Sequence, residues 1–214
     1  MRTLEDLIDT KDAALPLVGA WAQGASHPFE ILAPSQDRER MLLALQVTTR
    51  STMGAVAYET GGLLIDHGWL RVLGSGHPKL IRNIVDWNKE RSSGFLLVAD
   101  DVVGGFFALN GGGLGDDAGA MYYWAPDTLA WESLEIGYSD FLEWASTDRL
   151  QAFYADLRWS GWEADTRSIG ADQCFNFYPF LWTKEGSVQA SARKAVSIAE
   201  QYALNTELVA TTGR

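Results

Sequence analysis

The residues best placed for catalysis are Asp66 and His67, which are adjacent in the segment LIDHGWL. With Cys174, they would supply an Asp–His–Cys set in which the imidazole takes a proton from the thiol. Cys174, in DQCFNF, has no supporting motif, and a His-Gly pair is typical of a turn. We therefore assign no catalytic residue. We keep as an alternative a small enzyme or ligand-binding protein with a cleft near Asp66, His67 and Trp69.

A glycine-rich run, NGGGLGDD from Asn110 to Asp117, has the composition of a phosphate-binding loop. Such a loop leads from a strand into a helix and often carries a lysine. This run instead leads through two aspartates into AMYYWA, which has the pattern of a strand. The sequence therefore predicts a hairpin loop, in which the glycines supply turn geometry.

Two pairs of aspartates, Asp100-Asp101 and Asp116-Asp117, could hold a hard cation, since Ca²⁺ and Mg²⁺ bind several carboxylate oxygens. No spacing matches a calcium loop, and one cysteine with three scattered histidines gives no zinc pattern. We predict no metal and no cofactor. The two pairs are interpreted as exposed turn acids that contact a protein partner.

The acidity of the chain is concentrated in one stretch. Its net charge is −11, and ten of its 28 acids lie between Gly94 and Asp148, where there is no Lys or Arg. The remainder has 18 acids against 17 bases. This charge disfavours nucleic acid and anionic membranes as partners and favours a basic protein. A single cysteine, an N-terminus without a signal-peptide pattern and no apolar run of about 20 residues predict a cytoplasmic protein.

The sequence pattern predicts an α+β fold, whose helices and strands would position these residues. Residues 3–46 read as helices, and the chain between 54 and 145 holds short apolar runs separated by Gly, Asp or Pro, typical of a mainly antiparallel meander flanked by helices. The segment 159–182 is rich in aromatic residues, and Pro179 favours an aromatic flap or an edge strand there. We predict one domain over residues 1–182 and a polar tail over 183–214, with a possible helix around Ala195 and disorder at its end.

Three segments carry a family resemblance: YETGGLLI, FLLVADDVVGGFFALN and MYYWAPDTLAWESLEIGYSDFLEWA. Over residues 47–145 they resemble the SUKH superfamily of bacterial toxin-immunity proteins and fungal cell-wall regulators. GGLLIDHGWLRVLGSG and FYPFLWTKEG are similar to an uncharacterised bacterial family in or near that superfamily. The resemblance implies a twisted, mainly antiparallel sheet flanked by helices, with no catalytic residues to carry over.

Immunity-type members of SUKH bind and block secreted toxins, so the resemblance implies a non-enzymatic binding protein. In this chain the partner-binding residues would be the turn acids Asp100, Asp101, Asp116 and Asp117, and the partner a basic toxin. Two alternatives remain: the cleft near Asp66 and His67, or acids that only keep the protein soluble.

Overall fold

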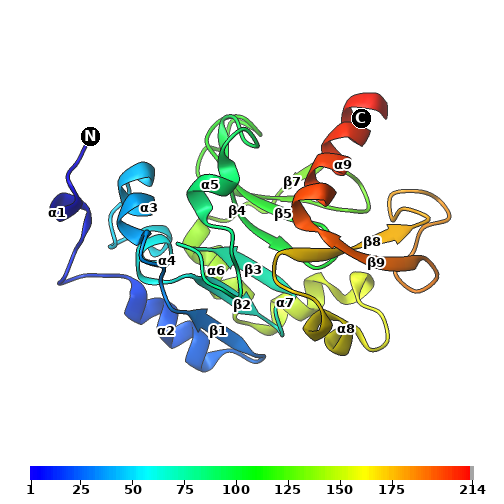
Figure 1. Cartoon of the computed structure of the whole chain (residues 1–214), viewed down its shortest axis with the longest axis horizontal. Coiled ribbons are helices and arrows are strands. Elements are labelled where there is room, and N and C mark those ends of the chain that lie inside the picture. Colours follow the sequence, from blue (N-terminus) through cyan, green and yellow to red (C-terminus); the bar gives the residue numbers. More distant parts are fainter. Residues whose placement is uncertain (213–214) are drawn as a thin grey trace.

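The computed structural model, which describes residues 1–212, contains a seven-stranded antiparallel sheet with helices packed against it (Figure 1). The strands follow one another across the sheet in chain order, so that each pairs with its sequence neighbours. They are Phe29–Leu32 (β1), Gly62–Ile65 (β2), Leu70–Leu73 (β3), Phe95–Asp101 (β4), Phe106–Asn110 (β5), Met121–Trp124 (β6) and Trp131–Ser133 (β7). The predicted α+β fold with an antiparallel meander is confirmed.

The helices include two that the sequence did not reveal. Their bounds are Leu4–Leu7 (α1), Leu15–Gly24 (α2), Arg38–Leu45 (α3), Thr52–Glu59 (α4), Ile84–Asn88 (α5), Tyr138–Ala145 (α6), Asp148–Phe153 (α7), the 3-10 turn Ala155–Leu157 (η1), Trp162–Ser168 (α8) and Ile198–Thr212 (α9). The missed helices are α4, where Gly54 suggested a turn, and α8, which lies in the segment 159–182 predicted to be an aromatic flap or an edge strand. The glycine of α4 is needed because a Cβ atom would lie 2.1 Å from the Thr48 carbonyl oxygen. Among residues 1–212, no helix is long and apolar enough to cross a membrane.

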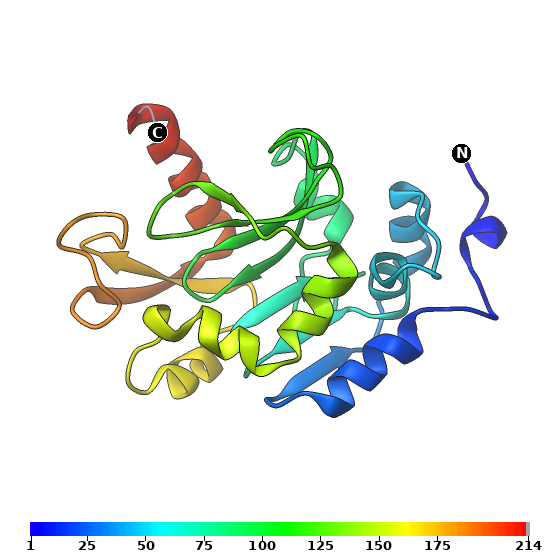
Figure 2. The ribbon, with the colours of Figure 1, turned by 180° about the vertical axis from the view of Figure 1, so that it is seen from behind.

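The side chains of the sheet alternate between two faces. One, here called the α6 face, packs against α6 and α7, as Figure 2 shows from behind; the Phe107 and Phe141 rings lie 5.0 Å apart there. The other, here called the α9 face, contacts the C-terminal helix through Tyr202, whose ring lies 4.9 Å from that of Phe106. Both faces therefore bury core residues, which belong to one hydrophobic cluster.

One row of residues crosses the α9 face and places the site. Cα pairing in register joins Glu30 of β1 to Leu64 of β2, Leu64 to Arg71 of β3, and Arg71 to Asp100 of β4. These four side chains therefore project from the same face. The helix α9 covers the other end of the sheet (Figure 1).

The C-terminal segment is part of the folded domain. This finding corrects the prediction of a polar tail that begins at residue 183. Ala192–Ser197 (β9) pairs with Gln173–Tyr178 (β8) in a second, two-stranded sheet, and α9 follows directly. Burial of Ile198 and Tyr202 holds this unit on the main sheet. Pro179 ends β8, consistent with the predicted edge strand. The disorder expected at the chain end concerns residues 213–214, which lie outside the described residues.

Candidate functional site

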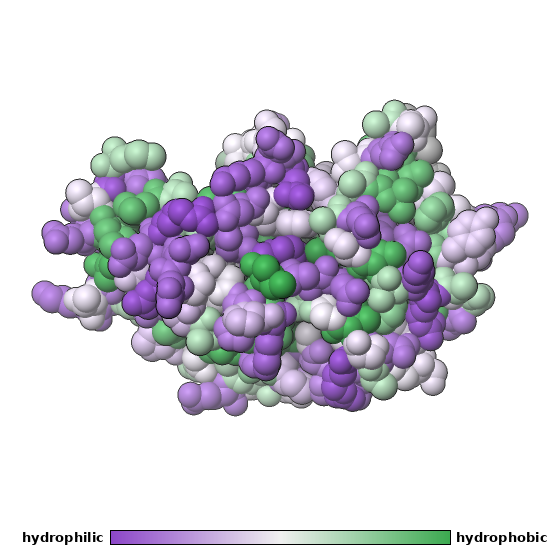
Figure 3. Space-filling view, in the orientation of Figure 1, coloured by the Kyte–Doolittle hydropathy of each residue, from purple (hydrophilic) through white to green (hydrophobic). Residues whose placement is uncertain are grey.

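A hollow of about 450 Å³ lies on the α9 face, over β2 and β3. In the view of Figure 3, which looks onto this face, hydrophilic residues surround small apolar areas. The hollow is lined by Glu30, Leu64, His67, Gly68, Arg71, Pro78, Lys79, Val102, Thr166, Arg167, Ile169, Gly170 and Ala171. Of the predicted cleft it includes only His67, and most of its lining comes from segments distant in sequence.

His67 reaches the hollow because of the turn between β2 and β3. Asp66 and His67 have φ values of 51° and 64°, and Gly68 follows with 84°. Asp and His tolerate this left-handed region better than most residues. The Arg167 guanidinium contacts the His67 ring, with Nη1 2.7 Å from Nδ1 and 3.4 Å from Nε2.

Arg71 lines the hollow and Asp100 lies opposite it on β4, and neither side chain is exposed to solvent. Arg71 Nε donates to Asp100 Oδ1 at 2.8 Å, and Nη2 lies 2.6 Å from the same oxygen. Arg71 Nη1 is also buried, and it has no hydrogen-bond partner among the described residues. A buried cationic donor without a partner costs free energy, so this nitrogen is suited to binding an anion.

Arg82 connects Asp100 to the segment before β8. Its Nη1 donates to Asp100 Oδ2, its Nε donates to Asp172 Oδ1 at 2.7 Å, and its Nη2 donates to the Ala171 carbonyl at 2.9 Å. Two guanidinium groups thus share the carboxylate of Asp100. The network fixes Ala171 at the wall of the hollow and leaves Asp100 no oxygen without a cationic partner.

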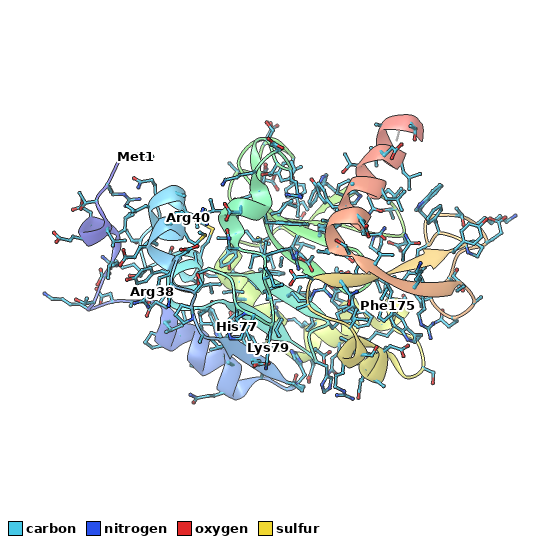
Figure 4. All side chains as sticks on the ribbon, viewed as in Figure 1. Met1, Arg38, Arg40, His77, Lys79 and Phe175 are labelled. Atoms are coloured by element: carbon cyan, nitrogen blue, oxygen red, sulfur yellow. The ribbon has the colours of Figure 1, made fainter. Side chains whose placement is uncertain are left out.

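The walls add further polar groups. The Thr166 hydroxyl is buried and has no hydrogen-bond partner in the described part of the chain. Lys79 Nζ contacts Glu30 Oε1 at 2.5 Å, and Figure 4 shows Lys79 between the β1–β2 side of the sheet and α8. Among the lining residues, Arg71, Lys79 and Arg167 are cationic and only Glu30 is anionic. Each of the three bases has an acidic partner: Asp100 for Arg71, Glu30 for Lys79 and Glu163 for Arg167.

Comparison with known proteins places the whole chain in one family. Residues 4–201 match the family model described as protein of unknown function DUF2625. The chain belongs to the DUF2625 family. It is similar to the uncharacterised YbfG protein of Escherichia coli K12, with 46% identity over 97% of both chains. It is also similar to an uncharacterised protein of Haemophilus influenzae Rd, with 41% identity over 96% of this chain and 94% of the relative. No solved structure matches it.

Asp66 and Trp69, the other two residues of the predicted cleft, are buried elements of the DUF2625 fold that do not line the hollow. The Asp66 carboxylate accepts from Arg158 Nη2. The Arg158 guanidinium lies 4.0 Å from the centre of the Trp162 ring and 5.0 Å from that of Trp69. This cluster supports the turn that presents His67, so of the three predicted residues only His67 contacts the hollow.

Asp100 and Asp101 were expected to be exposed turn acids, and this prediction is wrong, because both are completely buried. They belong to β4, so their side chains leave on opposite faces. Asp101 accepts hydrogen bonds from the hydroxyls of Tyr123 at 2.8 Å and Tyr154 at 2.9 Å on the α6 face. Burial raises the pKa of the Asp101 carboxyl, and these hydrogen bonds offset part of that increase.

Asp116 and Asp117 are exposed, in the loop that joins β5 to β6. The run Asn110–Asp117 therefore connects two strands of a hairpin, as predicted, and does not open a helix. Asp117 accepts a hydrogen bond from the Tyr122 hydroxyl at 2.6 Å, which lowers the pKa of its carboxyl. Of the four predicted partner-binding acids, these two remain available at the surface.

Cys174 is a core residue. Its burial raises the pKa of the thiol to about 12, which keeps it protonated near neutral pH. No group of three or more His, Cys, Asp or Glu side chains able to hold a metal ion occurs within residues 1–212. Sequence reasoning missed Arg71, Thr166 and Arg167. Only Arg71 had a signal, as the single charged residue in the apolar run WLRVL.

Proposed function

We propose that this DUF2625 protein binds a small organic anion, a carboxylate or phosphate monoester, in the hollow on the α9 face. The observation that carries the proposal is Arg71 Nη1, a buried cationic nitrogen without a partner among the described residues, beside a hollow that three basic residues and one acidic residue line. Charge-assisted hydrogen bonds to an oxyanion would satisfy it. The buried Thr166 hydroxyl offers a second polar contact, and Leu64, Val102 and Ile169 suit an apolar ligand body.

Binding of simple probes tests this proposal. Phenyl phosphate, benzoate and the neutral benzyl alcohol would be titrated into the full chain by calorimetry and by amide NMR. The two anions are expected to shift amides around residues 67–71 and 166–171, and the alcohol to bind at least about tenfold more weakly, since one lost charged contact costs more than 1.4 kcal/mol. Equal binding of all three, or binding of none, would overturn the proposal.

Two variants make the test specific to the hollow. Arg167→Gln removes an exposed cation from the wall and is expected to weaken phenyl phosphate binding at least about fivefold, given the size of a charged hydrogen bond. Arg50→Gln is the matched control, because Arg50 is an exposed arginine outside the hollow. An equal effect of both changes would show that general electrostatic attraction, and not the hollow, binds the anion.

A second candidate function is immunity-type binding of a basic protein in the cytoplasm, as implied by the SUKH resemblance, which itself stays a prediction. It is supported by eight of the ten acids between Gly94 and Asp148, which are exposed. None of these eight pairs with a Lys, Arg or His in the described part of the chain. Such a surface disfavours nucleic acid and anionic lipid. Co-purification with a neighbouring basic toxin, lost at high salt, tests it.

A further inference from the structure

A second hollow, on the opposite side of the molecule, has an apolar floor. It measures about 350 Å³ and lies between the residues that follow β7 and the helices α6 and α7. Leu134, Ile136, Trp144 and Phe153 supply its apolar surface, and Asp140 and Glu143 its acidic surface. Figure 2 shows these two helices on the near side of the sheet. We call this hollow the α6–α7 groove.

Aromatic packing holds the floor of the α6–α7 groove in place. The Trp144 ring stacks on Phe141 with a centroid distance of 5.8 Å and an angle of 23°. Phe153 meets Trp144 edge to face at 5.2 Å and Tyr123 at 5.1 Å, yet 36% of Phe153 is exposed. A large, fixed and partly exposed aromatic surface in a concave site is typical of a docking site and needs little ordering on binding.

The charges around the groove are unbalanced. Glu135, Asp140 and Glu143 are exposed and have no ion pair among residues 1–212. Arg149 is the one basic residue of the lining, and its Nε donates to the Thr147 hydroxyl at 3.3 Å. The field at the rim is therefore negative while the floor is apolar. An occupant must be cationic at its edges and apolar at its centre.

We infer that the α6–α7 groove docks a segment of a partner protein that presents Leu- or Phe-like side chains to Trp144 and Phe153 and Lys or Arg to Asp140 and Glu143. Long basic side chains can lay their stems on apolar surface while their charges reach rim carboxylates. Nucleic acid and anionic lipid would be repelled there. The inference rests on the second candidate function and is independent of anion binding on the α9 face.

A synthetic helical peptide of about 15 residues, with Leu and Lys at amphipathic spacing, is the probe. Two comparison peptides replace every Leu by Ser or every Lys by Glu. Titration into the labelled full chain is expected to shift amides of residues 134–153 with the Leu/Lys peptide, which binds at least about tenfold tighter than either comparison peptide. This ratio corresponds to the loss of one buried apolar anchor or one charged contact.

Two charge reversals locate the contact. Glu143→Lys is expected to weaken binding of the Leu/Lys peptide at least about fivefold, because it places a like charge at the rim. Glu39→Lys, at an exposed position of α3, changes the net charge equally and is expected to alter affinity less than about twofold. Equal effects of the two reversals would overturn the groove as the docking site.

The outcomes separate this inference from the candidate function beneath it. If the Lys/Ser peptide binds as tightly as the Leu/Lys peptide and shifts amides throughout the acidic stretch, the groove is wrong but a basic partner is still supported. If neither basic peptide shifts any amide, both are overturned. If the Leu/Glu peptide binds equally, the groove takes apolar segments without regard to charge, and the inference is overturned.

Discussion

Arg71 and Asp100 lie directly opposite each other in the β3–β4 pair, and two nitrogens of the guanidinium contact one oxygen of the carboxylate. This one-sided contact leaves the second carboxylate oxygen for Arg82 and leaves Arg71 Nη1 without a partner. The pairing of two strands thus determines both the burial of the charges and the unmet donor beside the hollow.

Removing the charge of Asp100 is expected to destabilise the fold strongly. Asp100→Asn would leave two arginines, at positions 71 and 82, without their shared carboxylate in a site where Asp100 and Arg71 have no exposure. Breaking a buried ion pair from one side costs about 3–5 kcal/mol. Urea denaturation would measure this loss. Asp116→Asn, in an exposed loop, is the control and is expected to change stability by less than about 0.5 kcal/mol.

Asp101 is expected to make the protein less stable as pH rises. Its pKa is raised in the folded state, mainly by burial, so the folded protein holds this proton at pH values where the unfolded chain has released it. The free energy of unfolding therefore falls from the ordinary aspartate pKa of about 3.9 up to the raised value. Denaturation series with Asp101→Asn should show a flatter pH profile over that window. A profile parallel to that of the unmodified protein would contradict the assignment.

Thr166→Val is expected to raise stability and lower anion binding together. The valine has the shape of threonine but removes a buried hydroxyl without a partner, so the free energy of unfolding should rise by about 1 kcal/mol. Phenyl phosphate binding should weaken in the same variant. The control is Thr52→Val, whose hydroxyl lies 2.8 Å from that of Ser139 and whose loss should cost about 1 kcal/mol. If Thr166→Val and Thr52→Val both stabilised or both destabilised the protein, the interpretation of Thr166 as a buried hydroxyl without a partner would be contradicted.

Two glycines in helices should respond in opposite ways to alanine. At Gly54 of α4, a new Cβ would lie 2.1 Å from the Thr48 carbonyl oxygen, so Gly54→Ala should cost at least about 1–3 kcal/mol through overpacking. At Gly19 of α2, nothing lies within 4 Å, so Gly19→Ala should stabilise the helix by up to about 1 kcal/mol. Thermal denaturation of both variants checks the pair.

The sequence predicts the sheet far better than the site. Short apolar runs between turn residues locate β2 to β6 because strand alternation and turn chemistry are local properties. The same local view misplaces Asp100 and Asp101. Two adjacent acids resemble a turn unless the partner charge, Arg71 on the neighbouring strand, is included. Burial of a charge depends on what lies across the strand pair, and this pairing is not visible in either segment alone.

The walls of the hollow were beyond sequence reasoning for a different reason. Arg167 contacts His67 across 100 positions of the chain, and Thr166 lies in α8, a helix of seven residues inside an aromatic-rich segment. Neither has a neighbour in sequence that marks it as part of a site. Their position is set by Arg82, which ties Ala171 and Asp172 to the sheet. Only the tertiary structure brings these groups together.

The order of strands across the sheet has a consequence for synthesis. Each strand pairs with its sequence neighbours, so the meander from β1 to β7 can form as the chain leaves the ribosome, without waiting for a distant segment. The hollow on the α9 face cannot. Its wall needs residues 166–171, and Arg82 needs Asp172, so the proposed anion site is completed only after about four fifths of the chain has been made. A nascent chain that ends before that point has the sheet but lacks the wall of the hollow.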